Sequence, residues 1–414
     1  MDKKPEKLVP EVRFKGFTDD WEQRKLGEIS KRVRNNDGRM NLPLLTISAR
    51  YGWMTQQSRF SASIAGREKK NYTLLKKHQL SYNHGNSKVA NYGTVYELTD
   101  YDEALVPKVY HSFSLTSENS SKFIESYFHT KKLDAQLRKF IASTARMDGL
   151  LNISFDDFMK VKLFAPERCE QSKISRIINL IEKLITLQQR KLELLKEIKK
   201  GLLQKMFADK SKFPILRFEG FHNEWEQRKL KNVYQKIGNA FVGTASPYYV
   251  DAGHFYLESN NIKNGQINRN HEVFINNSFY QKQSNKLLHT GDLVMVQSGH
   301  VGDTAVITQE YNNSAAHALI VFRNPKDKFL SDYLNFYFQN TSAKNKINIL
   351  AIGNTIRHVL ASDMSRFSVY FPNKDERKYI SNLLLKLQYT ITLQQSKISQ
   401  LTILKKYLLQ KLFI

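Results

Sequence analysis

The stretch WEQRKL occupies Trp21–Leu26 and occurs again at Trp225–Leu230. The copies extend upstream, where VRFKGF at residues 12–17 is matched by LRFEGF at residues 216–221. Ten of the fifteen positions in 12–26 and 216–230 are identical, at an offset of 204 residues. Such identity indicates an internal repeat, and a repeat decides the architecture before any local pattern does.

A second pair of copies closes each half of the chain. LITLQQRKLELLKEIKKGLLQKMF at residues 184–207 and TITLQQSKISQLTILKKYLLQKLF at residues 390–413 share fourteen of twenty-four positions, at an offset of 206. Between these frames the similarity nearly disappears. The sequence therefore predicts two units, each a variable body followed by a conserved helix. The predicted boundaries are 1–168 and 209–374 for the bodies, and 169–208 and 375–414 for the helices.

Apolar residues recur every seven positions in both conserved segments, which is typical of helices that pack in a coiled coil. The alternative is that each stripe only covers its own body. One Gln interrupts each stripe at an equivalent position. We predict antiparallel helices in which Gln188 meets Gln394 and fixes the register, so that replacing both with Leu raises stability and loosens the register. The predicted helix-pairing residues are Ile174, Ile181, Gln188, Leu195, Leu202, Ile380, Leu387, Gln394, Leu401 and Leu408.

The bodies, roughly 20–168 and 225–374, contain patterns of both strands and helices. Residues 94–98 and 293–296 have the β-branched and apolar composition of short strands, and glycines delimit them. Residues 122–140 and 330–338 have the composition of helices. We predict an α+β fold: two similar globular domains joined by two long antiparallel coiled-coil helices, as a pseudo-twofold internal repeat.

The chain is strongly basic. Its 414 residues include 64 Lys and Arg against 39 acidic residues, giving a formal net charge of +25 and a pI near 9.8. Such an excess attracts polyanions, and nucleic acid is the usual partner. The alternative is that the charge only maintains solubility. No apolar run approaches the roughly 18 residues of a spanning helix, and the start resembles no signal peptide, so we expect a cytoplasmic protein without a membrane partner.

Motifs that carry catalysis are missing from the sequence. It contains no phosphate-binding loop, no Asn/Asp-Pro-Pro-Tyr motif of amino-methyltransferases and no dinucleotide-binding glycine fingerprint. Cys169 is the single cysteine, and no His pair has the spacing of a zinc site. We expect no catalytic residue, no metal and no cofactor in this chain.

The conserved segment resembles a known family. Pro166, Glu170, Gln171 and Ile174 leading into the repeated helix resemble the conserved region of specificity subunits of type I restriction–modification systems, although the second copy has Arg377 in place of Gln171. The resemblance covers essentially the whole chain and implies two target-recognition domains. Each would read one half of a bipartite, asymmetric double-stranded DNA target.

The resemblance also implies partners. Modification subunits would methylate adenine with S-adenosylmethionine, and restriction subunits would translocate and cut DNA with ATP and Mg²⁺. The helices would then act as a spacer, so one added turn of about 5.4 Å would widen the gap between half-sites by one or two base pairs. Rival interpretations are a stand-alone DNA-binding regulator and a coiled-coil scaffold; a methyltransferase is disfavoured by the missing motifs.

Base contacts need Arg, Asn, Gln, Ser, Thr or His side chains, and phosphate contacts need Lys or Arg. Polar loops with this mixture occur in both bodies, although each alone has the composition of an ordinary loop. Basic pairs on the helices, such as Lys199-Lys200 and Lys405-Lys406, are expected to face solvent or partner subunits. The predicted DNA-binding residues are Arg50, Tyr51, Asn86, Ser87, Lys88, Asn91, Tyr92 and Arg146 in the first body and Asn260, Lys263, Ser298, His300, Asn354, Thr355, Arg357 and His358 in the second.

Overall fold

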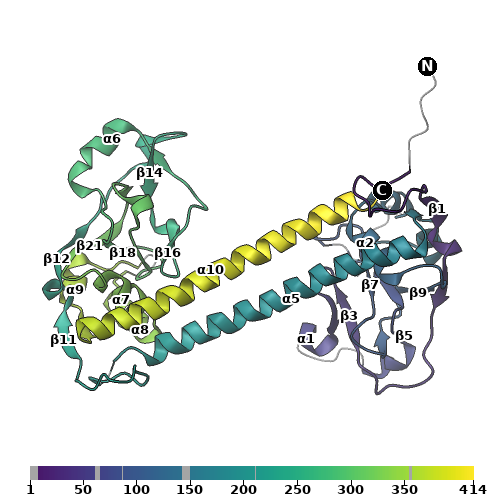
Figure 1. Cartoon of the computed structure of the whole chain (residues 1–414), viewed down its shortest axis with the longest axis horizontal. Coiled ribbons are helices and arrows are strands. Elements are labelled where there is room, and N and C mark those ends of the chain that lie inside the picture. The colour runs from purple at the N-terminus through teal and green to yellow at the C-terminus, as the bar shows by residue number, and fades with distance from the viewer. Residues whose placement is uncertain (1–7, 61–65, 86, 142–149, 210, 354–356) are drawn as a thin grey trace. The chain divides into compact units, whose positions relative to one another are not determined.

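The computed structural model describes residues 8–60, 66–85, 87–141, 150–209, 211–353 and 357–414. The chain divides into two compact units. The first unit comprises residues 1–189 and 397–414, and the second comprises residues 190–396. The long helices α5 (Arg168–Lys205) and α10 (Lys374–Lys411) contribute to both units (Figure 1).

Both units contain the same four-stranded antiparallel sheet. In the first unit the strand order is β2 (Ser30–Val33), β9 (His111–Leu115), β6 (Leu80–Asn83) and β7 (Thr94–Glu97). In the second unit it is β12 (Tyr234–Asn239), β21 (Leu319–Pro325), β18 (Leu293–Val296) and β19 (Thr304–Val306). In each sheet the first strand along the chain pairs with the last. The repeat therefore includes the bodies, where sequence similarity is nearly absent.

The WEQRKL repeat forms one strand of a two-stranded frame in each unit. Strand β1 (Glu22–Lys25) pairs with β10 (Lys162–Ala165), and β11 (Glu226–Lys229) pairs with β22 (Ser368–Phe371). The four residues of each repeat strand are exposed, whereas the flanking Trp21 and Trp225 are buried. The tryptophan anchors the frame strand next to the start of a long helix.

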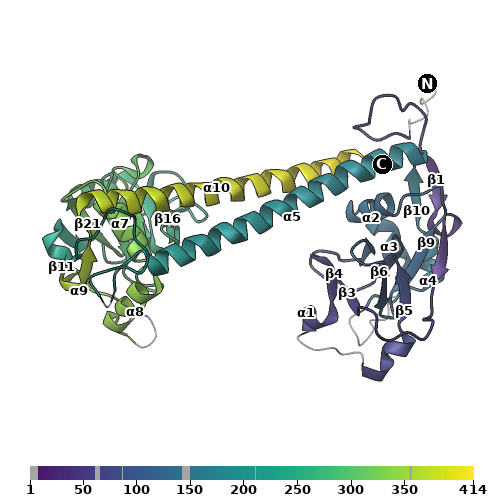
Figure 2. The ribbon, with the colours of Figure 1, turned by 60° about the horizontal axis from the view of Figure 1, so that its bottom comes forward.

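One helix of each body forms a middle layer between the sheet and the long helices. Helix α2 (Ser121–His129) does so in the first unit (Figure 2), and α7 (Leu330–Tyr337) does so in the second. Ser120 caps α2 by accepting a hydrogen bond from the N–H of Phe123. The core around α2 joins strand residues to both long helices and includes Phe123, Ile124, Tyr127, Leu80, Phe113, Ile174, Ile178, Leu409 and Leu412.

The long helices run antiparallel within each unit. The beginning of α5 shares a core with the end of α10 in the first unit, and the end of α5 shares a core with the beginning of α10 in the second. All ten residues predicted to pair the helices are buried or half-buried. Both helices have 38 residues, and α5 begins one residue before and ends three residues before the predicted segment 169–208. The predicted α+β class with two long helices is confirmed.

The bodies differ outside the shared sheet. The first adds the antiparallel pairs β3 (Leu45–Ser48) with β4 (Gly52–Thr55) and β5 (Thr73–Lys76) with β8 (Glu103–Val106). The second adds the hairpin β15 (Ile262–Lys263) and β16 (Gln266–Ile267), and a sheet ordered β13 (Tyr249–Val250), β17 (Phe274–Ile275), β14 (His254–Leu257) and β20 (Ala315–Ala316). Other α-helices of the bodies are α1 (Gln56–Phe60), α4 (Phe155–Met159), α6 (Asn277–Lys282), α8 (Thr341–Leu350) and α9 (Ala361–Arg366).

One helical expectation was wrong. Residues 122–140 do not form a single helix, because α2 ends at His129 and α3 (Asp134–Phe140) follows a turn. Lys131 has φ of 67° in this turn, and the hydroxyl of Thr130 donates to the carbonyl of Tyr127. No Gly or Pro marks the break in the sequence. Among the described helices, none is both long enough and apolar enough to cross a membrane.

Candidate nucleic-acid interface

A buried ion pair anchors the arm that precedes each body. The guanidinium of Arg13 donates twice to Glu170, at 2.8 Å each, and Arg217 donates twice to Glu376, at 2.7 and 2.8 Å. Both carboxylates are fully buried at the beginnings of α5 and α10. The hydrogen bond that Arg13 donates to Glu170 raises the pKa of the guanidinium above its ordinary value. These pairs hold two diverged bodies on the same frame.

In the second unit three polar loops meet where β18 ends. Ser298 forms a β-bridge with His358, and the N–H of Gly299 donates to the carbonyl of Arg357 at 3.2 Å. The Nε2 of His300 donates to the carbonyl of Ser259 at 3.0 Å. The loops at 259–261, 297–300 and 357–358 are therefore adjacent. Their outward side chains include exposed Asn260, His300, Arg357 and His358, while Ser298 is half-buried.

Within the 259–263 loop the side chains have different roles. Asn261 is buried, accepts from the N–H of Glu258 and donates to the carbonyls of Asn268 and His271. It holds the loop and offers no surface for a base. Lys263 is exposed on β15. Asn260 and Lys263 thus remain as the candidate contacts of this loop.

In the first unit the candidates lie on two loops. Arg50 and Tyr51 are exposed in the turn between β3 and β4, with the guanidinium 5.5 Å from the ring centroid. Lys88 and Asn91 are exposed in the loop after β6, and the amide of Asn83 joins this strand end to β3 by donating to the carbonyl of Ile47 at 3.1 Å.

Two further side chains of the loop after β6, Ser87 and Tyr92, are half-buried. The hydroxyl of Tyr82 fixes the loop by donating to the carbonyl of Tyr92 at 2.6 Å. His84, which precedes the loop, is buried with its two ring nitrogens 2.7 and 2.8 Å from the carbonyls of Leu151 and Val109, and so it supports the loop from inside. The predicted contacts Asn86, Arg146, Asn354 and Thr355 lie outside the described residues.

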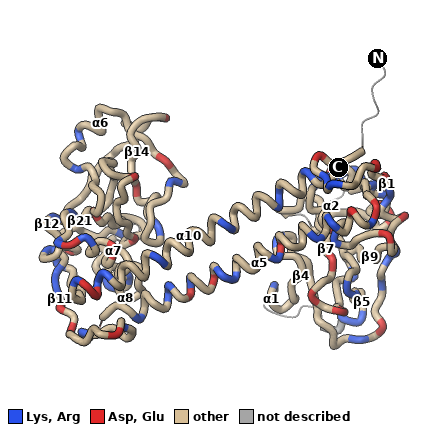
Figure 3. The backbone as a smooth tube through the Cα atoms, viewed as in Figure 1, with Lys and Arg blue, Asp and Glu red and all other residues tan. Residues whose placement is uncertain are grey.

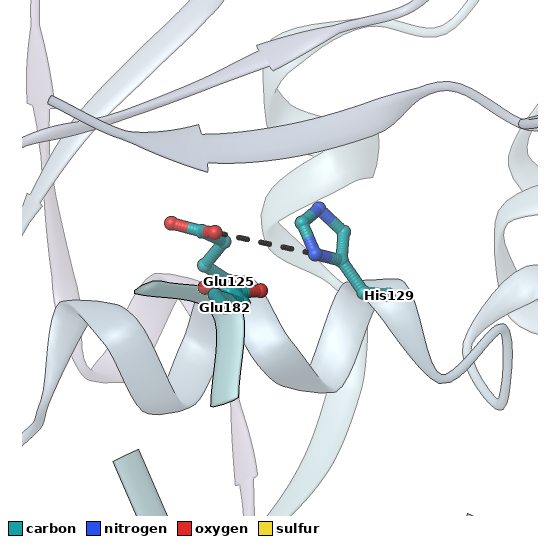
Figure 4. Close-up of side chains that lie close together, drawn as sticks. All are labelled: Glu125, His129 and Glu182. Atoms are coloured by element: carbon teal, nitrogen blue, oxygen red, sulfur yellow. Dashed lines mark ion pairs between the residues drawn. The ribbon is translucent and has the colours of Figure 1, made fainter. Parts of the chain in front are cut away.

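A buried cluster in the first unit connects α2 with both long helices. Glu125 and His129 of α2 and Glu182 of α5 point toward one another (Figure 4), with their ligand atoms within 4.8 Å. The ammonium of Lys122 lies between the carboxylates, 2.7 Å from Glu125 and 2.6 Å from Glu182. Because an ammonium already bridges the carboxylates, this arrangement fits an ion-pair network better than a metal site.

Burial and charge shape the titration of this cluster. Burial raises the pKa of Glu125 to about 7, against the attraction of Lys122. Burial alone would lower the pKa of Lys122, but Glu125 and Glu182 raise it above its ordinary value. Burial, with repulsion from Lys405 and Lys122, lowers the pKa of His129 to about 4. The Nε2 of His129 donates to the carbonyl of Val95, so its neutral ring has a defined role as a donor.

Lys and Arg occur along both long helices (Figure 3), but two of them do not face solvent as expected. Lys405 of α10 is half-buried and pairs with Glu182 at 2.8 Å. Lys199 of α5 is half-buried and donates to the amide oxygens of Gln339 and Gln388, at 2.6 Å each. The sequence shows a basic pair at each position, and only the packing of the body against the helix selects which lysine is buried.

Comparisons with known proteins agree with this architecture. Residues 222–402 match the family model of the type I restriction modification DNA specificity domain. The type I restriction enzyme MjaVIII specificity subunit of Methanocaldococcus jannaschii is 20% identical over 294 residues, which cover 69% of this chain and 68% of that protein.

Two solved structures have the same fold along nearly the whole chain. A type I restriction-modification system S subunit from M. genitalium has a TM-score of 0.61 at 12% identity, with 98% of this chain and 99% of that chain covered. A chain from a structure of the type I R-M system, concerned with complex assembly and conformational transition, has a TM-score of 0.51 at 14% identity, with 99% of each chain covered. Residues 222–402 thus match the type I restriction modification DNA specificity domain, and the whole chain, with its repeated frame and paired helices, has the fold of these solved structures.

Proposed function

We propose that this chain recognises a bipartite, asymmetric double-stranded DNA target and directs modification and restriction subunits to it. Each body reads one half-site. The catalytic steps, adenine methylation with S-adenosylmethionine and ATP-dependent translocation and cleavage with Mg²⁺, belong to those partners. The chain itself contributes sequence recognition and a docking frame.

The observation that carries the proposal is a shared frame with unlike loops. The same ion pair, the same strand pair and the same four-stranded sheet occur in both units. The polar loops built on that sheet differ in length, composition and added strands. Identical frames suit identical partner subunits, and different loops suit different base sequences, because base edges are read by side chains of the loops or helices that enter a groove.

The chemistry of the loops supports a DNA ligand. The second unit brings exposed Arg357, His358 and Asn260 together, a combination able to donate to bases and to phosphates. The net charge of +25 favours the approach of a polyanion. The first unit offers Arg50, Lys88 and Asn91 in the same way.

The test is to co-express the chain with its modification subunit and to map adenine methylation genome-wide by single-molecule sequencing. A two-part motif with unspecified bases between unlike halves is expected. Replacing residues 225–374 with the corresponding body of another family member should change one half of the motif only. The reciprocal replacement of residues 20–168 is the matched control and should change the other half only.

A stable, cofactor-binding complex that produces no methylation motif would contradict the proposal. It would favour the stand-alone regulator or the scaffold, and duplex binding by the chain alone would separate these two. A body replacement that changes both halves would contradict the assignment of one half-site to each body.

A further inference from the structure

The two units place different chemistry at equivalent positions of the junction between body and helices. Lys199 and Gln388 correspond to Lys405 and Glu182 by the 206-residue offset of the helical repeat. Helices α7 and α2 also correspond, because Tyr337 and Tyr127 each pack an aromatic edge against the equivalent Phe207 and Phe413. With this alignment Gln339 takes the place of His129, and Asn335 takes the place of Glu125.

In the first unit the junction neutralises its own charge. Lys405 pairs with Glu182, Glu182 also pairs with Lys122, and Lys122 pairs with Glu125. Two ammonium groups thus face two carboxylates. The neutral ring of His129 completes the contacts, so each ammonium group of this junction has a carboxylate partner within the protein.

In the second unit both carboxylates are replaced by amides. The ammonium of Lys199 is held by the oxygens of Gln339 and Gln388, which carry no charge. The amide of Asn335, at the position of Glu125, is committed to Thr304 and to the carbonyl of Gly265. Lys199 is therefore a half-buried cation whose nearest partners are dipoles, an arrangement that is costly unless an anion completes it.

A pocket of about 390 Å³ opens beside Lys199, entirely within the second unit. Lys196 and Lys200 of α5 and Lys344 of α8 also line it. Among the described residues of its lining there is no Asp or Glu. Lys344 is paired with Asp303 outside the pocket at 3.3 Å, whereas Lys196 and Lys200 have no carboxylate partner in the part of the chain that the structure describes. The N-terminal residues of α8, including Thr341, face the same space and add the positive end of a helix.

We propose that this pocket binds a phosphate group, either free or belonging to a nucleic-acid backbone. Lys199 is the central cation, and Lys196, Lys200 and Lys344 surround the anion. The amide oxygens of Gln339 and Gln388 hold Lys199 in place. Their NH₂ groups each donate once within the protein, to the carbonyl of Asn335 and to the amide oxygen of Gln266 at 2.9 Å each, and each has a second N–H that can donate to a phosphate oxygen. Several ammonium groups around one polar space suit a multiply charged oxyanion better than a single carboxylate.

The binding test titrates the full chain with inorganic pyrophosphate. Isothermal titration calorimetry at pH 7 and low chloride measures the affinity and the number of sites. One site per chain is expected. Lys199→Met should weaken binding at least tenfold. Gln388→Glu should do the same, because it gives Lys199 the internal carboxylate that Glu182 gives Lys405. Lys386→Met, an exposed position on α10 outside the pocket, is the matched control and should change binding less than twofold.

A second arm identifies the source of the phosphate. The affinity for duplex DNA is measured against salt for the wild type and for Lys199→Met. If a backbone phosphate occupies the pocket, the substitution lowers the slope of log affinity against log salt by about 0.9. If the ligand is a free phosphate compound, the slope is unchanged while pyrophosphate binding is lost.

The proposal is overturned if neither pyrophosphate binding nor the salt slope depends on Lys199 and Gln388. The proposal is also overturned if Lys199 and Gln388 affect only the binding of a protein partner. That result would indicate that an acidic side chain of the partner occupies the pocket. The pyrophosphate arm does not rest on the proposed function. A chain that binds no duplex DNA can therefore still contain this site, and the two failures are distinguishable.

Discussion

Glu170 and Glu376 are carboxylates without solvent contact, each satisfied by the two N–H groups of one arginine. Arg217→Met removes both donors from Glu376 and leaves it only the indole N–H of Trp225 at 3.2 Å. We expect the free energy of unfolding of the second unit to fall by about 3–5 kcal/mol, because a buried charge loses its counter-ion.

Arg228→Met is the matched control for this substitution. Arg228 pairs with Glu226 on the exposed frame strand of the same unit, where solvent screening makes the contribution of an ion pair to stability small. Urea unfolding of both variants measures the difference. Equal losses would contradict the anchoring role of the buried pair.

Lys199 gives the second unit a pH dependence. Burial, with repulsion from Lys344, lowers the pKa of Lys199 to about 8, against 10.5 ordinarily. Between these values the unfolded chain binds more protons than the folded one, so this group makes stability rise with pH across the window. Below pH 8 both states are protonated, and the folded state carries the full cost of the buried charge.

Lys199→Met removes that cost. The variant should be more stable than the wild type by about 1 kcal/mol at pH 7, after allowance for partial exposure, and the advantage should fade toward pH 10. Urea unfolding at pH 7, 8, 9 and 10 measures it. The wild type and the variant share the neighbouring charged residues, which are Lys196, Lys200, Lys344 and Asp303. A stability difference that does not change with pH would therefore rule out titration of Lys199 as its cause.

The composition of the loops indicated where candidate contacts lie, but not which side chains are available. Asn261 and Asn260 are neighbours in one polar loop, yet one caps the backbone and the other faces solvent. Ser298 and His358 were predicted on separate loops, and only the fold joins them in a β-bridge. The sequence does not distinguish a polar residue that hydrogen-bonds within the protein from one whose side chain is available to a ligand.

At the scale of elements, the ion-pair network of the first unit ties α2 to α5 and α10. Glu182→Gln leaves Lys405 without its carboxylate and Lys122 with Glu125 alone. We expect the first unit to lose about 2 kcal/mol of unfolding free energy, since the removed carboxylate is mostly buried.

Gln388→Glu is the reciprocal change in the second unit. It should leave the stability of that unit unchanged or raise it, because it gives Lys199 a counter-ion. Denaturation of both variants at pH 7 compares them; a loss for both would contradict the electrostatic account.

The seven-residue stripes located both long helices to within three residues, since that signal is local and repeated. The order β2, β9, β6 and β7 was beyond sequence reasoning, because strands 30–33 and 111–115 pair across about 80 residues of diverged chain. The break between α2 and α3 was missed because a Lys rather than a Gly adopts the left-handed conformation there.

At the scale of the whole molecule, the helices are proposed to set the spacing of the DNA target. Insertion of seven residues at equivalent points of α5 and α10 preserves the seven-residue stripe and lengthens each helix by about 10 Å. The unspecified gap in the methylated motif should widen by about three base pairs. Methylome mapping reads the gap directly.

A seven-residue insertion at Asp100, in an exposed loop of the first body, is the control and should leave the gap unchanged. An unchanged gap after the helix insertion would show that something other than helix length fixes the spacing. The repeat and the family resemblance were accessible from the sequence. The target bases were not, because they depend on the loops that differ between the two bodies.

The division of the chain has a consequence for its synthesis. The first unit needs residues 397–414, whose Leu409, Leu412 and Phe413 complete the core around Trp21 and Phe123. The ribosome must first make the second unit, about 200 residues, which takes roughly 10–40 s at 5–20 residues per second. During that interval the first body has an open apolar face, while the second unit is contiguous in the chain and can close earlier. Chaperones should therefore bind nascent chains at the N-terminal body, although this body is translated first.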